Sequence, residues 1–171
     1  ALEVALLAHE GQSRRSGEPF ISHPVAVGLI LASSQMEEAT VVSGLLHDTV
    51  EDTCATAEDI ELGFGPRIAA LVAEVTDDKA LPKAERKRQQ IAHAPHMSRD
   101  GGLIKTADKT ANVLDLVRDP PPDWSHARVV AYLDWAESVV GGLLDPDPAL
   151  LAGFKDAIFA GRRALSASEE A

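Results

Sequence analysis

The chain has 171 residues, 45% of them hydrophobic and 25% charged, which is the balance of one soluble globular domain of ordinary size. Its formal net charge of −11 repels nucleic acid backbones and anionic membranes, so we expect neither as a partner. Cys54 is the only cysteine, so an intrachain disulfide is excluded and a reducing compartment is favoured.

The sequence contains no secretory signal segment and no apolar run near ~18 residues. Together with the single cysteine, this predicts a cytoplasmic location. The chain starts at Ala1 without an initiator methionine, and we expect the natural N-terminus to lie upstream.

Apolar residues recur at helical spacing along most of the chain, whereas alternating β-branched runs are nearly absent and aromatic residues make up only 4%. The pattern predicts helices, in chain order, over residues 2–10, 24–32, 37–50, a short stretch after Thr56, 67–75, 83–93, 103–117, 124–144 and 150–165. We therefore predict an all-α bundle of about eight to ten helices, one domain over residues 1–171, with a frayed tail at 166–171.

The most informative segment is 45–52, Leu-Leu-His-Asp-Thr-Val-Glu-Asp. His47 and Asp48 offer one nitrogen and one oxygen ligand, a pair that suits a divalent ion such as Mn²⁺ or Fe²⁺. Glu51 and Asp52 follow three to four residues later, so a continuing helix would place them on nearly the same face. A metal site and a solvated helix end both fit this segment when it is taken alone.

A metal would need ligands from other segments. His23, just before a proline, is one candidate, although a lone histidine there also fits a capping or surface role. Asp108 is another, because Lys105, Asp108, Asn112 and Asp115 form a polar stripe at helical spacing. The alternative for this stripe is an ordinary solvated helix face.

Taken together, the motifs resemble the hydrolase domain of the RelA/SpoT alarmone enzymes, above all the single-domain small alarmone hydrolases of the metazoan SpoT-homologue type. The resemblance is carried by residues 9–12, 14–24, 45–53, 64–65, 75–88, 104–112 and 124–128. It implies an all-α HD fold, a Mn²⁺ ion, and removal of the 3′-pyrophosphate from ppGpp and pppGpp, giving GDP or GTP plus pyrophosphate.

The resemblance also implies roles for individual residues. The metal ligands would be His23, His47, Asp48 and Asp108. Glu51 and Asp52 would position or activate the attacking water. The substrate would be met by Arg14, Arg15, Lys83, Asn112 and Arg128, and Lys105 is expected in the same basic rim. The negative net charge of the chain makes such a rim necessary for a phosphorylated substrate.

Several expectations concern neighbouring residues. Thr110 and Ala111 are small where the family usually carries bulkier residues, which predicts a wider nucleoside pocket. The segment Arg86-Lys87-Arg88 is expected to form an exposed helix face, and Lys109 a solvated side chain. The final helices are amphipathic and could pair with a second copy of the chain.

Two alternative functions remain open from the sequence. One is an HD-type phosphatase acting on NADPH or another 2′- or 3′-phosphorylated nucleotide, which a wider pocket would favour. The other is a non-catalytic nucleotide sensor. The presence of both Glu51 and Asp52 argues against a sensor, because a sensor has no need of water-activating acids.

Overall fold

The computed structural model describes the backbone of residues 1–169 and side chains as far as residue 166. Within these residues the chain is helical apart from its loops and an isolated bridge between Ser13 and Pro19, which confirms the all-α prediction. In chain order the helices are α1 (Leu2–Ala8), α2 (Ser22–Ser33), α3 (Glu38–Leu46), α4 (Thr49–Asp52), α5 (Ala57–Phe64), α6 (Pro66–Val75), α7 (Lys83–His93), the 3-10 helix η1 (Ala94–His96), α8 (Arg99–Arg118), α9 (His126–Gly141) and α10 (Pro148–Glu169).

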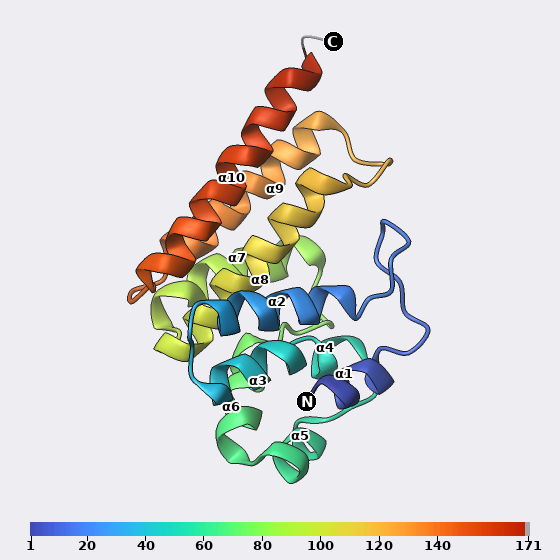
Figure 1. Ribbon diagram of the computed structural model, residues 1–171, viewed down its shortest axis with the longest axis vertical. Coiled ribbons are helices and arrows are strands. Elements are labelled where there is room, and N and C mark those ends of the chain that lie inside the picture. The colour runs from blue at the N-terminus through green and yellow to red at the C-terminus, as the bar shows by residue number, and fades with distance from the viewer. Residues whose placement is uncertain (170–171) are drawn as a thin grey trace.

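Helix α8 connects the two halves of the fold. Figure 1 shows α10 running beside α9 and α8 in the upper half of the molecule, with α1 to α6 gathered in the lower half. Most residues of α8 are buried, and its apolar side chains belong to two core clusters, one shared with α9 and α10 and one shared with α2 and α6. A third cluster joins α1, α3, α5 and α6. A polar side chain on α8 is therefore held rigidly at the centre of the molecule.

The stretch predicted as one helix over residues 37–50 is interrupted at His47 and Asp48, so α3 and α4 are separate elements. At this break the His47 imidazole donates from Nδ1 to the Gly44 carbonyl oxygen at 2.8 Å. Asp48 has φ −92° and ψ −6°, which is off the regular helical conformation. The interruption redirects α4 and changes the direction in which its acidic residues point.

Two helices are longer than the sequence predicts. α8 begins at Arg99 because the Ser98 side chain accepts from the Gly101 backbone N–H, while Glu74 accepts from Ser98. α10 continues to Glu169, so the frayed tail predicted at 166–171 is wrong as far as residue 169. The last two residues of the predicted tail, 170 and 171, lie outside the described part of the chain.

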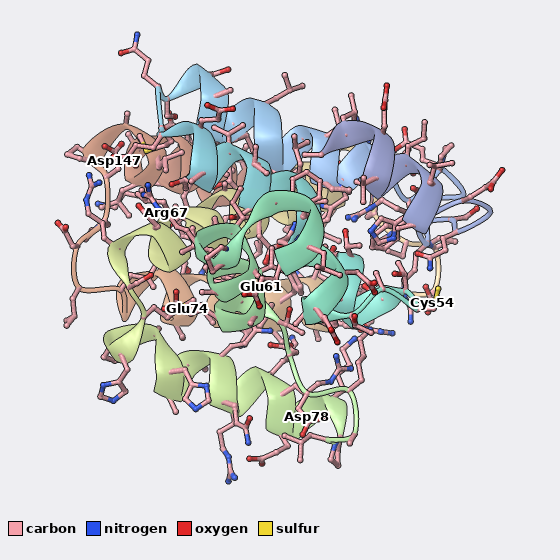
Figure 2. The ribbon with its side chains drawn as sticks, turned by 90° about the horizontal axis from the view of Figure 1, so that it is seen from below. Cys54, Glu61, Arg67, Glu74, Asp78 and Asp147 are labelled. Atoms are coloured by element: carbon pink, nitrogen blue, oxygen red, sulfur yellow. The ribbon has the colours of Figure 1, made fainter. Side chains whose placement is uncertain are left out.

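Helix α7 lies at the edge of the fold. Figure 2 shows it at the side of the molecule, with Asp78 in the loop that leads into it. None of its residues is fully buried, and it packs mainly against α9. No helix within residues 1–169 is both long and apolar enough to span a membrane.

Two glycines bring α2 and α3 close together. A Cβ atom at Gly28 would lie 2.7 Å from the Leu45 Cδ2 atom, and one at Gly44 would collide with the fully buried Leu31 side chain. Only residues without a side chain allow this distance between the helices. The close contact places the start of α2 beside the end of α3.

We expect Gly44→Ala to destabilise the fold by about 1–3 kcal/mol, because the added methyl group overpacks the contact between α2 and α3. Gly153→Ala is the matched control, since a Cβ at this exposed α10 position meets nothing within 4 Å. The control should stabilise by about 0.5–1 kcal/mol, the usual helical advantage of alanine over glycine. Urea denaturation of both variants measures this, and equal midpoints would contradict the packing argument.

Candidate functional site

Three side chains that are distant in sequence meet at the centre of the molecule. His23 comes from the start of α2, His47 from the break between α3 and α4, and Asp108 from the middle of α8. All three are buried, and their ligand atoms lie within 4.8 Å of one another. Asp48 adjoins them, with its oxygens 3.1 Å from His47 Nε2 and 3.6 Å from His23 Nε2.

The hydrogen bonds of the cluster fit a cation. Because His47 uses Nδ1 to bond Gly44, its Nε2 atom faces the carboxylates. This Nε2 atom is buried and has no hydrogen-bond partner within the described residues, despite lying 3.1 Å from Asp48 Oδ1. A buried nitrogen that faces carboxylate oxygens without bonding to them is the arrangement of a metal-binding imidazole whose other nitrogen is fixed by a carbonyl.

The charges of the cluster agree with this geometry. Burial alone would lower the pKa of His47, but the charges of Asp48 and Asp108 raise this pKa to about 9. Burial would raise the carboxyl pKa values of Asp48 and Asp108, yet neighbouring cationic groups hold both below their usual range. At neutral pH the cluster thus holds two carboxylates, and a divalent ion binding there would displace a proton from His47.

Two further acids lie on α4. The Glu51 carboxylate accepts from the Asp77 backbone N–H at 3.0 Å and lies 3.4 Å from both Lys79 Nζ and Arg86 Nη1. Burial raises the pKa of Glu51, although the hydrogen bond from Asp77 opposes this. Asp52 forms an ion pair with Lys79. The loop before α7 therefore holds both acids beside the cluster.

The cluster opens into a cavity of about 270 Å³, the first cavity. One wall carries the histidines and acids, and the opposite wall is formed by α7 and α9. The residues of the opposite wall are Lys83, Arg86, Lys87, Gln90, Tyr132 and Trp135. The first cavity therefore lies between an acidic face and a cationic, aromatic face.

A second cavity of about 320 Å³ adjoins the first and is more apolar. The residues that line both cavities are Arg14, Phe20, Lys83, Asn112 and Tyr132. The second cavity extends from these shared residues to Leu116, Pro121 and Trp124. Together the two cavities form an elongated space with a polar, charged end and an aromatic end.

Comparison with known proteins identifies the family of the chain. The family model described as an HD domain matches residues 1–131. The chain belongs to the HD-domain family. The matched residues include the adjacent His47 and Asp48.

Similar proteins cover nearly the whole chain. The guanosine-3′,5′-bis(diphosphate) 3′-pyrophosphohydrolase MESH1 of Xenopus tropicalis is 46% identical over 163 residues, which is 93% of this chain and 90% of that protein. The bifunctional (p)ppGpp synthase/hydrolase SpoT of Escherichia coli is 45% identical over 120 residues, 66% of this chain and 17% of that protein. A solved structure of a metazoan SpoT orthologue that hydrolyses ppGpp matches with TM-score 0.89 and 39% identity, covering 96% of this chain and 93% of that one.

Most of the residues predicted to meet substrate lie at the cavities of the HD domain. Arg14 donates to Asn112 Oδ1 at 2.9 Å and pairs with Asp115 at 2.9 Å, while Asn112 donates to Asp108 Oδ1 at 2.5 Å. The Lys105 ammonium is less free than predicted, because it is buried and donates to the Val75 carbonyl oxygen at 2.8 Å.

Arg15 lines the second cavity, whereas Arg128 is not among the residues that line either cavity. Both pair with the same oxygen of Asp123, at 3.1 Å and 3.6 Å respectively. Arg128 also lies over the Trp124 ring, with its guanidinium carbon 4.4 Å from the ring centroid. Within the chain, Asp123 thus takes the position between two arginines that an anionic group of a ligand could take.

Three expectations from the sequence are wrong. Arg86 and Lys87 line the first cavity instead of forming an exposed face, and Lys109 is buried, with an ion pair to Asp108 at 2.9 Å. The sequence did contain a pattern that indicates the position of Arg86 and Lys87. They follow Lys83 by three and four residues, which puts all three on one face of α7.

The predicted wider pocket also fails. Ala111 packs in the core, and Thr110 lines a different hollow beside α2 and α10. Neither lines the two cavities, because residues that precede Asn112 by one or two positions point to other faces of α8.

Sequence analysis also missed His9 and Gln12. His9 is buried and stacks on Phe20 with ring centroids 4.6 Å apart. Its Nδ1 atom bonds Gln12 at 2.9 Å, and Gln12 donates to the Asp52 carbonyl oxygen at 2.8 Å. These contacts support α4 from the N-terminal side.

We expect Asp108→Ala to lose most of the bound divalent metal, because the variant lacks the carboxylate that faces both histidines. Asp156→Ala is the control, since it removes the same charge from an exposed position on α10. Elemental analysis of the purified variants measures the metal content. A normal metal content in Asp108→Ala would remove Asp108 from the ligand set.

Proposed function

We propose that the chain is a metal-dependent hydrolase that removes the 3′-pyrophosphate of ppGpp and pppGpp, giving GDP or GTP plus pyrophosphate. The observation that carries this proposal is the first cavity, where a buried His/Asp cluster faces a cationic wall. Proteins named for this reaction in the comparison are similar to the chain over nearly its full length. The combination suits a small substrate that carries several phosphates.

The proposed metal ligands are His23, His47, Asp48 and Asp108. Two imidazoles and two carboxylates form a mixed nitrogen and oxygen donor set, which suits Mn²⁺ among the common divalent ions. When bound, such an ion supplies Lewis acidity toward the phosphoryl oxygens and lowers the pKa of a coordinated water. The orphaned Nε2 atom of His47 supports this assignment.

Glu51 is the proposed general base. Hydrolysis forms a bond between a water oxygen and the phosphorus nearest the ribose, and it breaks the bond between that phosphorus and the ribose 3′-oxygen. The 3′-oxygen leaves with the bonding electrons and gains one proton, which balances the proton that water loses. One water proton must be taken up, and burial raises the pKa of Glu51 toward a value that favours this transfer. Asp52, on the same short helix, is proposed to orient the water.

The cations of the cavities offset the negative charge of the chain locally. Phosphates are proposed to lie in the first cavity, between the metal cluster and α7. The nucleoside is proposed to lie in the second cavity, near the rings of Trp124 and Tyr132. The proposed substrate contacts are completed by Arg14, Arg15, Lys83, Asn112 and Arg128. Lys105 lines the first cavity, where its ammonium group donates to the Val75 carbonyl oxygen.

We extend the proposal to the domain extent, the location and the partners of the protein. We treat residues 1–171 as one hydrolase domain, because α9 and α10 share a core with α8 although the family match ends at residue 131. We also propose that the protein is cytoplasmic and that its partner is a small nucleotide. Its final helices are proposed to pair with a second copy of the chain.

An assay of the Mn²⁺-loaded protein with ppGpp and, separately, with NADPH tests the function. Pyrophosphate released from ppGpp is the expected product. Orthophosphate from NADPH alone would replace the proposal with a nucleotide phosphatase. If the metal-loaded protein hydrolyses neither substrate, the result would favour a nucleotide sensor. With Thr110 and Ala111 outside the cavities, no observation favours NADPH.

We expect Glu51→Gln to lower kcat for ppGpp by about 10²- to 10⁴-fold, because the amide cannot take up the water proton. Metal content should stay normal, since the amide keeps the size of the side chain. Glu58→Gln, on the exposed side of α5, is the matched control. Full activity in Glu51→Gln would remove Glu51 from the mechanism.

We expect Asp123→Asn to lower KM for ppGpp by about two- to fivefold at unchanged kcat, because Arg15 and Arg128 lose a competing carboxylate. The effect is small because the ion pairs are exposed. Asp145→Asn makes the same charge change at an exposed pair with Arg99. Steady-state kinetics of both variants provide the test, and an unchanged or higher KM in Asp123→Asn would show that Asp123 does not compete with substrate.

A further inference from the structure

Lys87 lies on the wall of the first cavity that α7 and α9 form together. Its ammonium nitrogen lies 4.3 Å from the centroid of the Trp135 ring and 5.1 Å from that of the Tyr132 ring. Trp135 Nε1 also donates to the Lys87 carbonyl oxygen at 3.1 Å. One tryptophan therefore holds both the backbone and the charged end of Lys87, which limits where this charge can lie.

Other cations surround this ammonium group. Burial and repulsion from Lys83, Lys109 and Arg128 lower the pKa of Lys87 to about 8. Lys109 is compensated by Asp108, but within the described residues no carboxylate lies within 4.0 Å of the Lys87 nitrogen. A half-buried cation that has other cations and no acid as neighbours provides a strong local attraction for an anion.

The two cavities show which part of a substrate Lys87 would meet. Lys83, one helical turn earlier, lines both cavities, whereas Lys87 lines only the first. Lys87 also lies over the same Trp135 ring as Lys109, whose nitrogen is 4.4 Å from the ring centroid. Lys87 thus lines the same cavity as the His/Asp cluster, where the phosphates are proposed to lie, and does not line the second cavity. Arg86 points to the same space but is already paired with Glu51.

We propose that Lys87 binds the outer phosphate of the 3′-pyrophosphoryl group, the one not attached to the ribose, and so sets a preference for two phosphates over one at that position. This inference rests on the proposed function, since it assigns a role within the same site. Lys83 at the junction of the cavities would meet the phosphate attached to the ribose.

The test compares two substrates that differ only in the outer phosphate, guanosine 5′-diphosphate 3′-diphosphate and guanosine 5′-diphosphate 3′-monophosphate. In Lys87→Met the ratio of their kcat/KM values should fall about 10- to 100-fold, the usual effect of one lost charge-assisted contact. Lys87→Arg should keep most of the ratio. Arg88→Met removes the same charge from the exposed face of α7 and should leave the ratio unchanged.

Calorimetry of the Mn²⁺-loaded proteins gives a second readout that needs no turnover. Lys87→Met should bind inorganic pyrophosphate about 10- to 100-fold more weakly than the wild type does, with little change for inorganic phosphate. Circular dichroism checks folding, and Lys87→Gln takes the place of Lys87→Met if that variant unfolds.

Two results would overturn the role of Lys87: an unchanged substrate ratio, or equal losses for both substrates in a folded variant. Failure of the proposed function gives a different result. In that case the wild type releases no pyrophosphate from the 3′-diphosphate substrate, and the calorimetric comparison of pyrophosphate with phosphate still decides whether Lys87 binds the outer phosphate.

Discussion

The site depends on one constraint, the close approach of α2 and α3 across the buried helix α8. Gly28 and Gly44 allow this approach, and it brings His23 and His47 to the same point as Asp108. His23, His47 and Asp108 come from three different parts of the fold, so none of them could move without disturbing a packed core. Burial of the carboxylates at this point is costly unless positive charge compensates it. In the protein alone, the imidazoles and Lys109 supply that charge.

Helix α8, which holds Asp108, also connects the His/Asp cluster to residues that line both cavities. Asn112, one turn further along α8, donates to Asp108 and accepts from Arg14. The Gly44 carbonyl that orients His47 belongs to the helix packed against α2. The His/Asp cluster and the residues that line both cavities therefore share supporting contacts.

Local charge decides what the cavities attract, although the chain as a whole is strongly acidic. The net charge of −11 acts at long range and is screened by salt, whereas the cations of α7 act within a few ångströms and in a partly desolvated space. Three cations of α7, Lys83, Arg86 and Lys87, line the first cavity. The helix is held there by the bond from Trp135 to its backbone and by the bonds of Arg86 and Gln90 to Glu51 and Asp77. The wall that would bind phosphate is the least buried element of the site.

The sequence by itself determined the helical class, the approximate position of most helices and the adjacency of His47 and Asp48, because these depend on short-range spacing. It predicted a frayed C-terminal tail where the structure has a helix as far as residue 169, and a continuous helix where His47 and Asp48 interrupt it. Such ends depend on capping and on contacts with distant residues, which a local pattern does not contain.

Only the tertiary structure decided which of the scattered cations face the cavities. The spacing of Arg86 and Lys87 from Lys83 puts them on one face of α7, but the sequence does not show what that face meets. It lines the first cavity because Trp135 and Glu51 lie opposite it in space. Thr110 and Ala111 were expected at the nucleoside pocket because the family usually carries bulkier residues there, yet the helical rotation directs them elsewhere. The chemistry of a residue can be inferred from its type and neighbours in sequence, but the surroundings that select its role are formed by packing.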